Sequence, residues 1–200
     1  MTDDYRHLDR LYDVLERLSE KICCGTCGVC ENDLIYLLDS EVRTFEKLNV
    51  PIIEIEGVYF LQKSAADDGF CPFRDRIKRS CTIYNMRPAC CRLFPLEIRS
   101  EALNPFWALC LYCPKTSDET SNLKSIALSF LPDIEESLSQ DLLDSFLRAD
   151  KISRRIEVAL GVNSKAELLQ AVRISSKGIR KEVPIGRESC KGSFALRALR

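Results

Sequence analysis

The chain has 200 residues, of which 46% are hydrophobic and 30% charged, and its formal net charge at pH 7 is −1. This length is enough for one domain, or one domain with an added region, around a buried core. The balanced charge excludes a general electrostatic affinity for nucleic acid or for an acidic surface. No apolar run is long enough to cross a membrane, and the N-terminus lacks the apolar centre of a secretory signal, so a cytoplasmic protein without membrane contact is expected.

The first predicted element is a helix over residues 3–22, because Leu8, Leu11, Leu15 and Leu18 recur at steps of three and four. A short strand over 33–38 and a helix over 40–49, capped by Asp39 or Ser40, are predicted next. Two apolar runs, 52–55 and 58–61, flank a Glu-Gly pair and predict a β-hairpin.

Between residues 71 and 91, Pro72 and Pro88 favour loops with one or two short helical turns. Residues 93–98 and 106–109 are predicted strands joined by a turn at Asn104-Pro105.

Beyond Cys113 the apolar spacing is helical. It predicts helices over 125–131, 134–146 and 152–160, and a further helix through Val172 that Ser164 would cap. From residue 175 onward, seven Lys or Arg accompany two Glu, which predicts a basic, disordered tail.

The expected fold class is α+β. It combines a cysteine-rich, loop-rich metal-binding core of short strands with an N-terminal helix and a helical C-terminal half. The predicted divisions are a cysteine-cluster metal-binding domain with the N-terminal helix (1–115), a helical C-terminal region (116–174) and the tail (175–200).

Cysteine usage is the most informative feature, because ten of the 11 cysteines lie between Cys23 and Cys113. In a reducing compartment this density favours metal binding or redox chemistry over disulfides. Their spacing gives C-x2-C-x2-C, then three cysteines separated by nine residues each, then C-x2-C. The candidate metal ligands are Cys24, Cys27, Cys30, Cys71, Cys81, Cys91, Cys110 and Cys113. Cys23 and Cys90 adjoin candidates and are expected to be spare thiols or part of a multinuclear centre, and Cys190 to be a free thiol.

Thiolate is a soft ligand that suits zinc, copper(I) and iron–sulfur clusters. A C-x2-C-x2-C run is typical of ferredoxin-like cluster binding, in which proline follows a further cysteine. Cys71-Pro72 and Cys113-Pro114 both have that neighbour. The single histidine, His7, lies far from the cysteines, which argues against a Cys2His2 zinc site. An iron–sulfur cluster is therefore the favoured cofactor, with zinc as the alternative.

The string Cys81-Thr-Ile-Tyr-Asn-Met-Arg-Pro-Ala-Cys-Cys-Arg-Leu-Phe-Pro95, together with the run 24–30 and Cys71, resembles the CxxCxxCC cysteine-cluster family. The resemblance covers about residues 23–98 and implies zinc or iron chelation, without a settled reaction. The family's first motif ends in two adjacent cysteines, whereas Glu31 follows Cys30 here. Either Glu31 supplies an oxygen ligand, or Cys23, or Cys110 and Cys113, supply the missing thiolate.

The sequence contains no phosphate loop, dinucleotide fingerprint or nucleophile elbow. The predicted function is metal binding through clustered thiolates in a redox, metal-handling or accessory role. One alternative is a radical or methyl-transfer enzyme, because Cys23-x3-Cys27-x2-Cys30 has the spacing of S-adenosylmethionine radical enzymes. The other is a zinc-stapled interaction module, which would bind an unknown protein partner through its helical C-terminal half.

Overall fold

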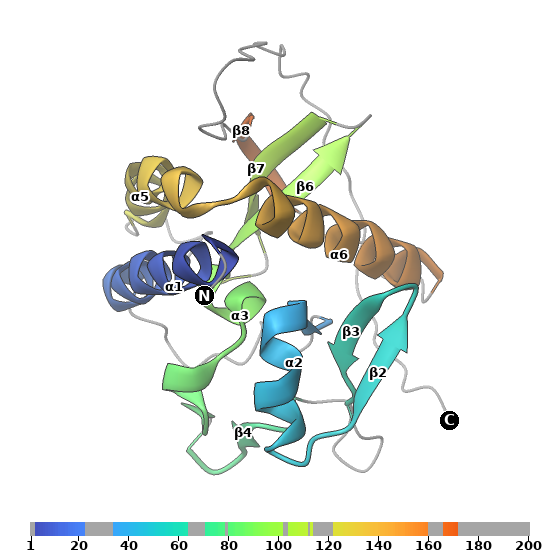
Figure 1. Cartoon of the computed structure of the whole chain (residues 1–200). Coiled ribbons are helices and arrows are strands. Elements are labelled where there is room, and N and C mark those ends of the chain that lie inside the picture. The colour runs from blue at the N-terminus through green and yellow to red at the C-terminus, as the bar shows by residue number, and fades with distance from the viewer. Residues whose placement is uncertain are drawn as a thin grey trace.

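The computed structural model describes residues 3–22, 34–63, 71–78, 80–101, 104–111, 113, 122–159 and 166–171. In Figure 1, helices α1, α5 and α6 cross the middle of the molecule, and a small sheet of β6, β7 and β8 lies above them. A second sheet and the short helix α3 lie below these helices. This mixture of helices and small antiparallel sheets confirms the α+β fold class. No described helix has both the length and the apolar character needed to cross a membrane.

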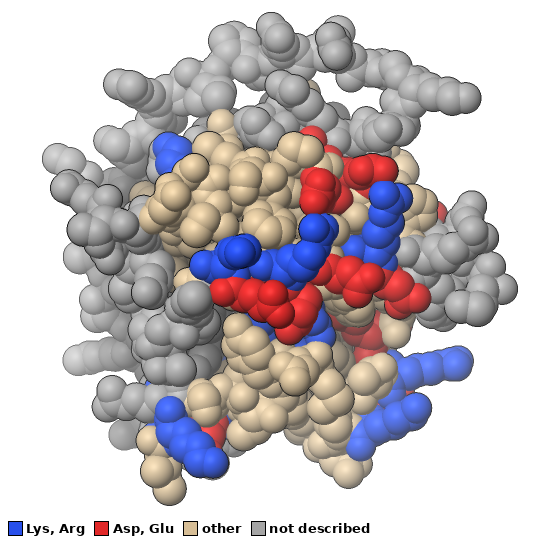
Figure 2. Space-filling view, turned by 90° about the vertical axis from the view of Figure 1, so that its left-hand side faces the viewer, with Lys and Arg blue, Asp and Glu red and all other residues tan. Residues whose placement is uncertain are grey.

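The N-terminal helix α1 (Asp3–Ile22) has the bounds that the leucine spacing predicts. Its apolar stripe is buried, with Leu11 1% and both Leu15 and Leu18 0% exposed. Arg10 and Arg17 on its outer face form ion pairs of 2.7 and 3.1 Å with Glu136 and Asp133 of α5 (Leu123–Ser137). Basic and acidic side chains are correspondingly mixed on this face of the molecule (Figure 2). Exposed ion pairs stabilise by only about 0–1 kcal/mol each, so the buried leucines dominate this packing.

A first antiparallel sheet has the strand order β1-β3-β2, where β1 is Tyr36–Leu37, β2 Ile52–Ile55 and β3 Val58–Leu61. The predicted hairpin of β2 and β3 is confirmed. Glu56 and Gly57 have φ of 52° and 76°, as a tight two-residue hairpin turn requires. Strand β1 is shorter than predicted because α2 (Asp39–Glu46) begins almost immediately after it.

The segment around the central cysteines consists of loops and short elements, as Pro72 and Pro88 predict. Strands β4 (Arg74–Asp75) and β5 (Ser80–Cys81) pair in a two-stranded antiparallel ribbon. They are followed by the 3-10 helix η3 (Tyr84–Met86) and the one-turn helix α3 (Ala89–Leu93).

The second three-stranded sheet has the order β6-β7-β8, where β6 is Leu96–Glu101, β7 Asn104–Cys110 and β8 Ala166–Ala171. The prediction of a helix from Ser164 through Val172 is wrong, because this segment pairs antiparallel with β7. Pairing with the edge of β7 overrides a high local helix preference, because Ala, Glu, Leu and Gln are all strong helix formers. The turn predicted at Asn104-Pro105 is also displaced, because both residues belong to β7. Pro105 fits there because pairing with β8 starts only at Phe106, so its missing N–H is not needed on that side.

Two helices replace the three that the apolar spacing predicts between residues 125 and 160. Helix α5 continues past Pro132, and α6 (Gln140–Ala159) runs through the predicted gap between residues 146 and 152. The largest hydrophobic cluster combines residues of α1, α3, β6, β7, α5 and α6. Trp107 of β7 lies in this cluster with 0% exposure, and its Nε1 donates to Glu135 Oε1 at 2.8 Å.

Candidate metal centre

Six candidate or neighbouring cysteines lie within the described residues, and none of them forms a disulfide: Cys71, Cys81, Cys90, Cys91, Cys110 and Cys113. Cys23, Cys24, Cys27, Cys30, Glu31 and Cys190 lie outside the described residues. The part played by the first cysteine run therefore stays a prediction.

The β4–β5 ribbon brings Cys71 and Cys81 onto neighbouring chain segments. The Cys71 carbonyl accepts from the Arg74 N–H at 3.1 Å, which forms a turn, and Arg74 then pairs directly with Cys81. The loop between the strands is fixed by Asp75, whose Oδ1 accepts from the N–H groups of Ile77 and Lys78, both at 2.9 Å. These hydrogen bonds lower the pKa of Asp75, the one from Lys78 contributing most.

Helix α3 places Cys91 near both of these cysteines. Cys71, Cys81, Cys90 and Cys91 all pack against one apolar cluster that includes Phe45 and Phe73. Burial raises the pKa of Cys71 to about 11, with smaller raising effects of Cys91 and Cys81 and a lowering backbone hydrogen bond from Phe73. Cys71 thus lies within electrostatic range of both other cysteines. We call Cys71, Cys81 and Cys91 the thiol cluster.

Cys90 lies beside the thiol cluster and also contacts the first sheet. Its Sγ is 3.9 Å from the Sγ of Cys91 and donates to the Tyr36 carbonyl at 3.1 Å. The hydrogen bond with Cys90 is the largest cause of the raised pKa of Cys91, and burial adds to it. The sequence predicts Cys90 as a spare thiol or as part of a multinuclear centre, and its contact with the Cys91 sulfur is a feature that spacing does not reveal.

The C-terminal cysteine pair is buried, with Cys110 2% and Cys113 6% exposed. Cys110 ends β7 and lines one cavity together with Cys90 and Cys91. Cys91 is therefore both a member of the thiol cluster and part of the lining of the cavity that Cys110 reaches.

The described side chains do not form a complete metal site by themselves. Among the residues that the structure describes, no three His, Cys, Asp or Glu side chains are placed to hold one metal ion. Cys71, Cys81 and Cys91 are therefore not arranged as three ligands of one ion. A four-thiolate site that includes any of them needs ligands beyond the described residues, and the run 24–30 is the predicted source.

Two arginines of the family-like string have different roles. The Arg87 guanidinium lowers the pKa of Cys91 against the stronger raising causes, and lies 3.7 Å from the centroid of the Tyr84 ring. Arg92 is only 9% exposed and serves the framework instead. It donates to the carbonyls of Asn85 and Arg87 and forms a 2.7 Å ion pair with Glu16 of α1.

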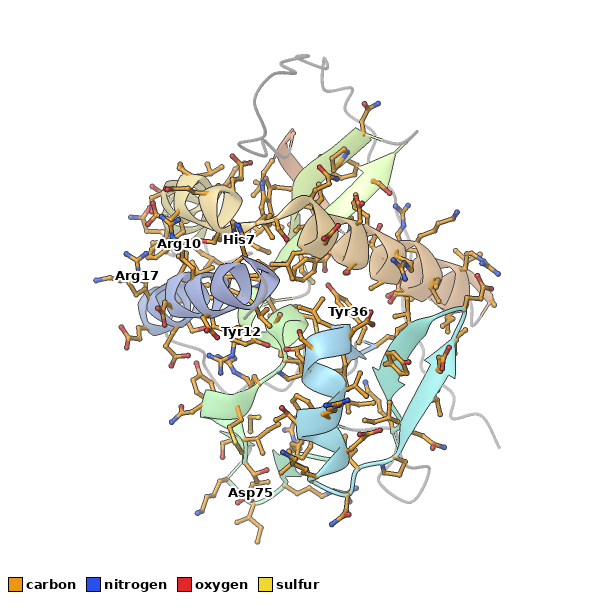
Figure 3. The ribbon with its side chains drawn as sticks, viewed as in Figure 1. His7, Arg10, Tyr12, Arg17, Tyr36 and Asp75 are labelled. Carbon is orange, nitrogen blue, oxygen red and sulfur yellow. The ribbon has the colours of Figure 1, made fainter. Side chains whose placement is uncertain are left out.

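Glu41 is a site residue that sequence reasoning missed. Although only 5% exposed, its carboxylate accepts from the N–H groups of Leu38 and Ala89, each at 2.8 Å, and from the Tyr12 hydroxyl. It thereby joins α1 and α2 to the first residue of α3, which carries Cys90 and Cys91. Tyr12 lies on the lower side of α1, toward α3 (Figure 3). Burial raises the pKa of Glu41 despite these hydrogen bonds.

The sequence contains no clear signal for Glu41, because a capping box is recognised by Ser or Thr at the N-cap and Leu38 stands there. The Glu41 side chain bonds back to an N–H three residues earlier, as the acidic member of a capping box does. The predicted caps, Asp39 and Ser40, are already inside the helix, and Leu38 occupies the N-cap position.

Comparison with known proteins adds one finding. No curated protein and no solved structure matches the chain. Residues 21–119 match the model of the CxxCxxCC family, described as "Putative zinc- or iron-chelating domain", which confirms that the cysteine-rich region resembles this family.

Proposed function

We propose that this protein binds metal through thiolates drawn from residues 24–113, as an iron–sulfur cluster in preference to zinc, in a redox, metal-handling or accessory role. The observation that carries the proposal is that Cys71, Cys81 and Cys91 come from three chain segments, form no disulfide and pack against one apolar cluster. The family match supports chelation of zinc or iron and leaves the choice of metal open.

The thiol cluster suits a cation for an electrostatic reason. Burial and neighbouring sulfurs raise the pKa of Cys71 and Cys91, so without a cation both thiols stay protonated near neutral pH. A bound metal would stabilise the thiolate forms and release their protons. Arg87 contributes part of the compensating positive charge.

The proposed ligands are the eight predicted cysteines, with the thiol cluster and the run 24–30 as the first group to test. The C-x2-C-x2-C spacing and the Cys-Pro pairs favour iron–sulfur over zinc. A cluster would supply one-electron redox chemistry, whereas zinc would only close the fold.

The first test is anaerobic purification followed by iron, zinc and acid-labile sulfide analysis with an absorption spectrum. The expected result is near-stoichiometric iron and sulfide with absorption in the visible range. Colourless protein holding zinc alone would replace the redox role with the structural one. Protein with neither metal would refute the proposal.

The second test changes single ligands. Cys71→Ser, Cys81→Ser and Cys91→Ser are each expected to lose at least about half of the bound metal, because a hydroxyl does not replace a soft thiolate. Cys190→Ser is the control and should retain it. Wild-type metal content in all three cluster variants would exclude the thiol cluster from the site.

A further inference from the structure

A cavity of about 110 Å³ lies where α6 faces β1, α3 and β6. Its α6 side includes Asp150, Ser153 and Arg154, and Tyr36 and Cys90 line it from the opposite elements. Tyr36 lies between α6 and α3 (Figure 3).

Two buried polar atoms on the α6 side have no hydrogen-bond partner: Asp150 Oδ2 and Ser153 Oγ. The Asp150 side chain is 13% exposed, and Arg154 Nη1 is 4.0 Å from Oδ2, too far for a hydrogen bond. Buried polar groups in folded proteins are almost always satisfied, so these two atoms indicate a missing donor.

The charges around the cavity favour a cation. Its lining contains three carboxylates, Glu97, Asp150 and Glu157, against two guanidiniums, Arg99 and Arg154. Arg99 is already paired with Glu97 at 2.6 Å, and Arg154 Nη1 also reaches the Ser100 carbonyl at 3.4 Å. Burial raises the pKa of Asp150 to about 6 although both arginines lower it, so the neighbouring charges do not fully compensate the carboxylate.

The spacing of the two acceptors on α6 indicates which kind of cation fits the cavity. Asp150 and Ser153 are three residues apart on α6, so their side chains are neighbours on one helix face. Two adjacent acceptors match the paired N–H donors of a planar guanidinium, and a tyrosine in the lining suits its weakly hydrated plane. A protein cavity of about 150 Å³ can hold benzene. A cavity of about 110 Å³ therefore has room for a guanidinium group, which is smaller than benzene.

We propose that this cavity binds a guanidinium group, whose N–H donors bond to Asp150 Oδ2 and Ser153 Oγ. The source is a free guanidino compound or an arginine side chain of a partner. Cys91 and Cys110, two candidate metal ligands, line the same cavity, but neither acceptor of the proposed guanidinium is one of them.

The test titrates the purified protein, with its metal, with methylguanidinium chloride at pH 7.5 and constant ionic strength, following backbone amide NMR shifts. Saturable shifts are expected in residues 150–154, with a dissociation constant in the millimolar range and at least fivefold weaker binding of methylammonium. Asp150→Asn should weaken methylguanidinium binding at least tenfold. Ser153→Ala should weaken it about threefold, which provides a second variant if the first fails to fold.

Asp141→Asn, an exposed position on the same helix, is the matched control and should bind as the wild type does. Equal binding by Asp150→Asn would overturn the proposal, as would tighter binding of acetate, which would indicate an anion site on the arginines. If no probe gives saturable shifts, water alone satisfies Asp150 Oδ2 and Ser153 Oγ. That result would also overturn the guanidinium proposal. Metal content measured on the same samples separates any of these failures from failure of the metal-binding proposal.

Discussion

Glu41 positions thiols that it does not itself contact. Three donors from α1, the start of α2 and the start of α3 end on one carboxylate with little access to water. Removing a buried acceptor leaves each donor with its desolvation penalty, about 1–3 kcal/mol per group. Glu41 is thus one support of α3, beside the Arg92–Glu16 ion pair and the buried Leu93.

Glu41→Ala is expected to lower the free energy of unfolding by about 3 kcal/mol and to reduce metal content, because the Leu38 and Ala89 N–H groups lose their acceptor. The free energy of unfolding of Glu41→Gln should lie between the values of Glu41→Ala and the wild type, since the glutamine amide oxygen can still accept a hydrogen bond. Urea unfolding with metal analysis provides the measurement.

Glu46→Ala, an exposed change on the same helix, is the matched control and should stay within about 0.5 kcal/mol of wild type. A Glu41→Ala variant as stable as this control would show that water replaces the carboxylate at no cost.

At the residue scale, the sequence indicates candidate ligands but not the residues that support them. Spacing makes Cys71, Cys81 and Cys91 candidates, because metal ligands have few acceptable separations, and their role as ligands stays a prediction. Glu41 and Asp150 cannot be identified from spacing, since an acidic residue on a helix is usually exposed and nothing local indicates that it is buried. The roles of Cys24, Cys27 and Cys30 stay predictions.

The β4–β5 ribbon is the element that matters most for the thiol cluster. Its strands have two residues each, so the loop between them contributes much of its order. Asp75 fixes this loop through two backbone N–H groups. Its pKa is lowered in the folded protein, so its stabilising effect is complete above the ordinary aspartate pKa and is lost as the pH falls through the lowered value.

Asp75→Ala is expected to release metal to a competing chelator about three times faster than wild type at pH 7.5, because Cys71 and Cys81 lose their common support. The difference should shrink as the pH falls through the pKa of Asp75. Stopped-flow transfer to a coloured chelator measures both.

Ile77→Ser is the control within the same loop. The Ile77 side chain is 95% exposed, and its substitution leaves the backbone N–H bonded to Asp75. Equal release rates for the two variants would show that the loop does not order the cysteines.

Elements defined by local pattern were predicted well, and those defined by distant pairing were not. Helix α1 and the β2–β3 hairpin follow from leucine spacing and from a Glu-Gly turn, both local signals. The helix predicted through Val172 is instead strand β8, because pairing with β7 is a contact across more than fifty residues of chain that no local window contains. The predicted break between residues 131 and 134 is likewise absent, because α5 runs continuously through Pro132.

At the scale of the whole molecule, one hydrophobic cluster connects elements on both sides of residue 115. Leu15 and Leu18 of α1, Leu93 of α3 and Leu131 of α5 belong to the same cluster. The predicted domain boundary at 115 stays a prediction, and so does a protein partner for the C-terminal helices.

Removing the metal with a chelator under reducing conditions is expected to lower the melting temperature by about 10 °C or more. Metal binding in small sites contributes several kcal/mol to folding, and each kcal/mol shifts the midpoint by about 2–4 °C in a chain of this size. Calorimetry and far-ultraviolet circular dichroism should report one shared transition, because α1, α3 and α5 share a core. Unchanged melting of a verified metal-free sample would show that the metal has no structural role.

The single tryptophan of this chain gives the protein an internal optical reporter. Trp107 is fully enclosed, its indole N–H is bonded to Glu135, and it lies three residues before Cys110. Its fluorescence should therefore be blue-shifted in the folded state. The near-ultraviolet and visible bands of an iron–sulfur chromophore would quench this emission, whereas zinc has a filled d shell and would leave it bright. Intrinsic emission can thus distinguish the two metals in an unmodified sample.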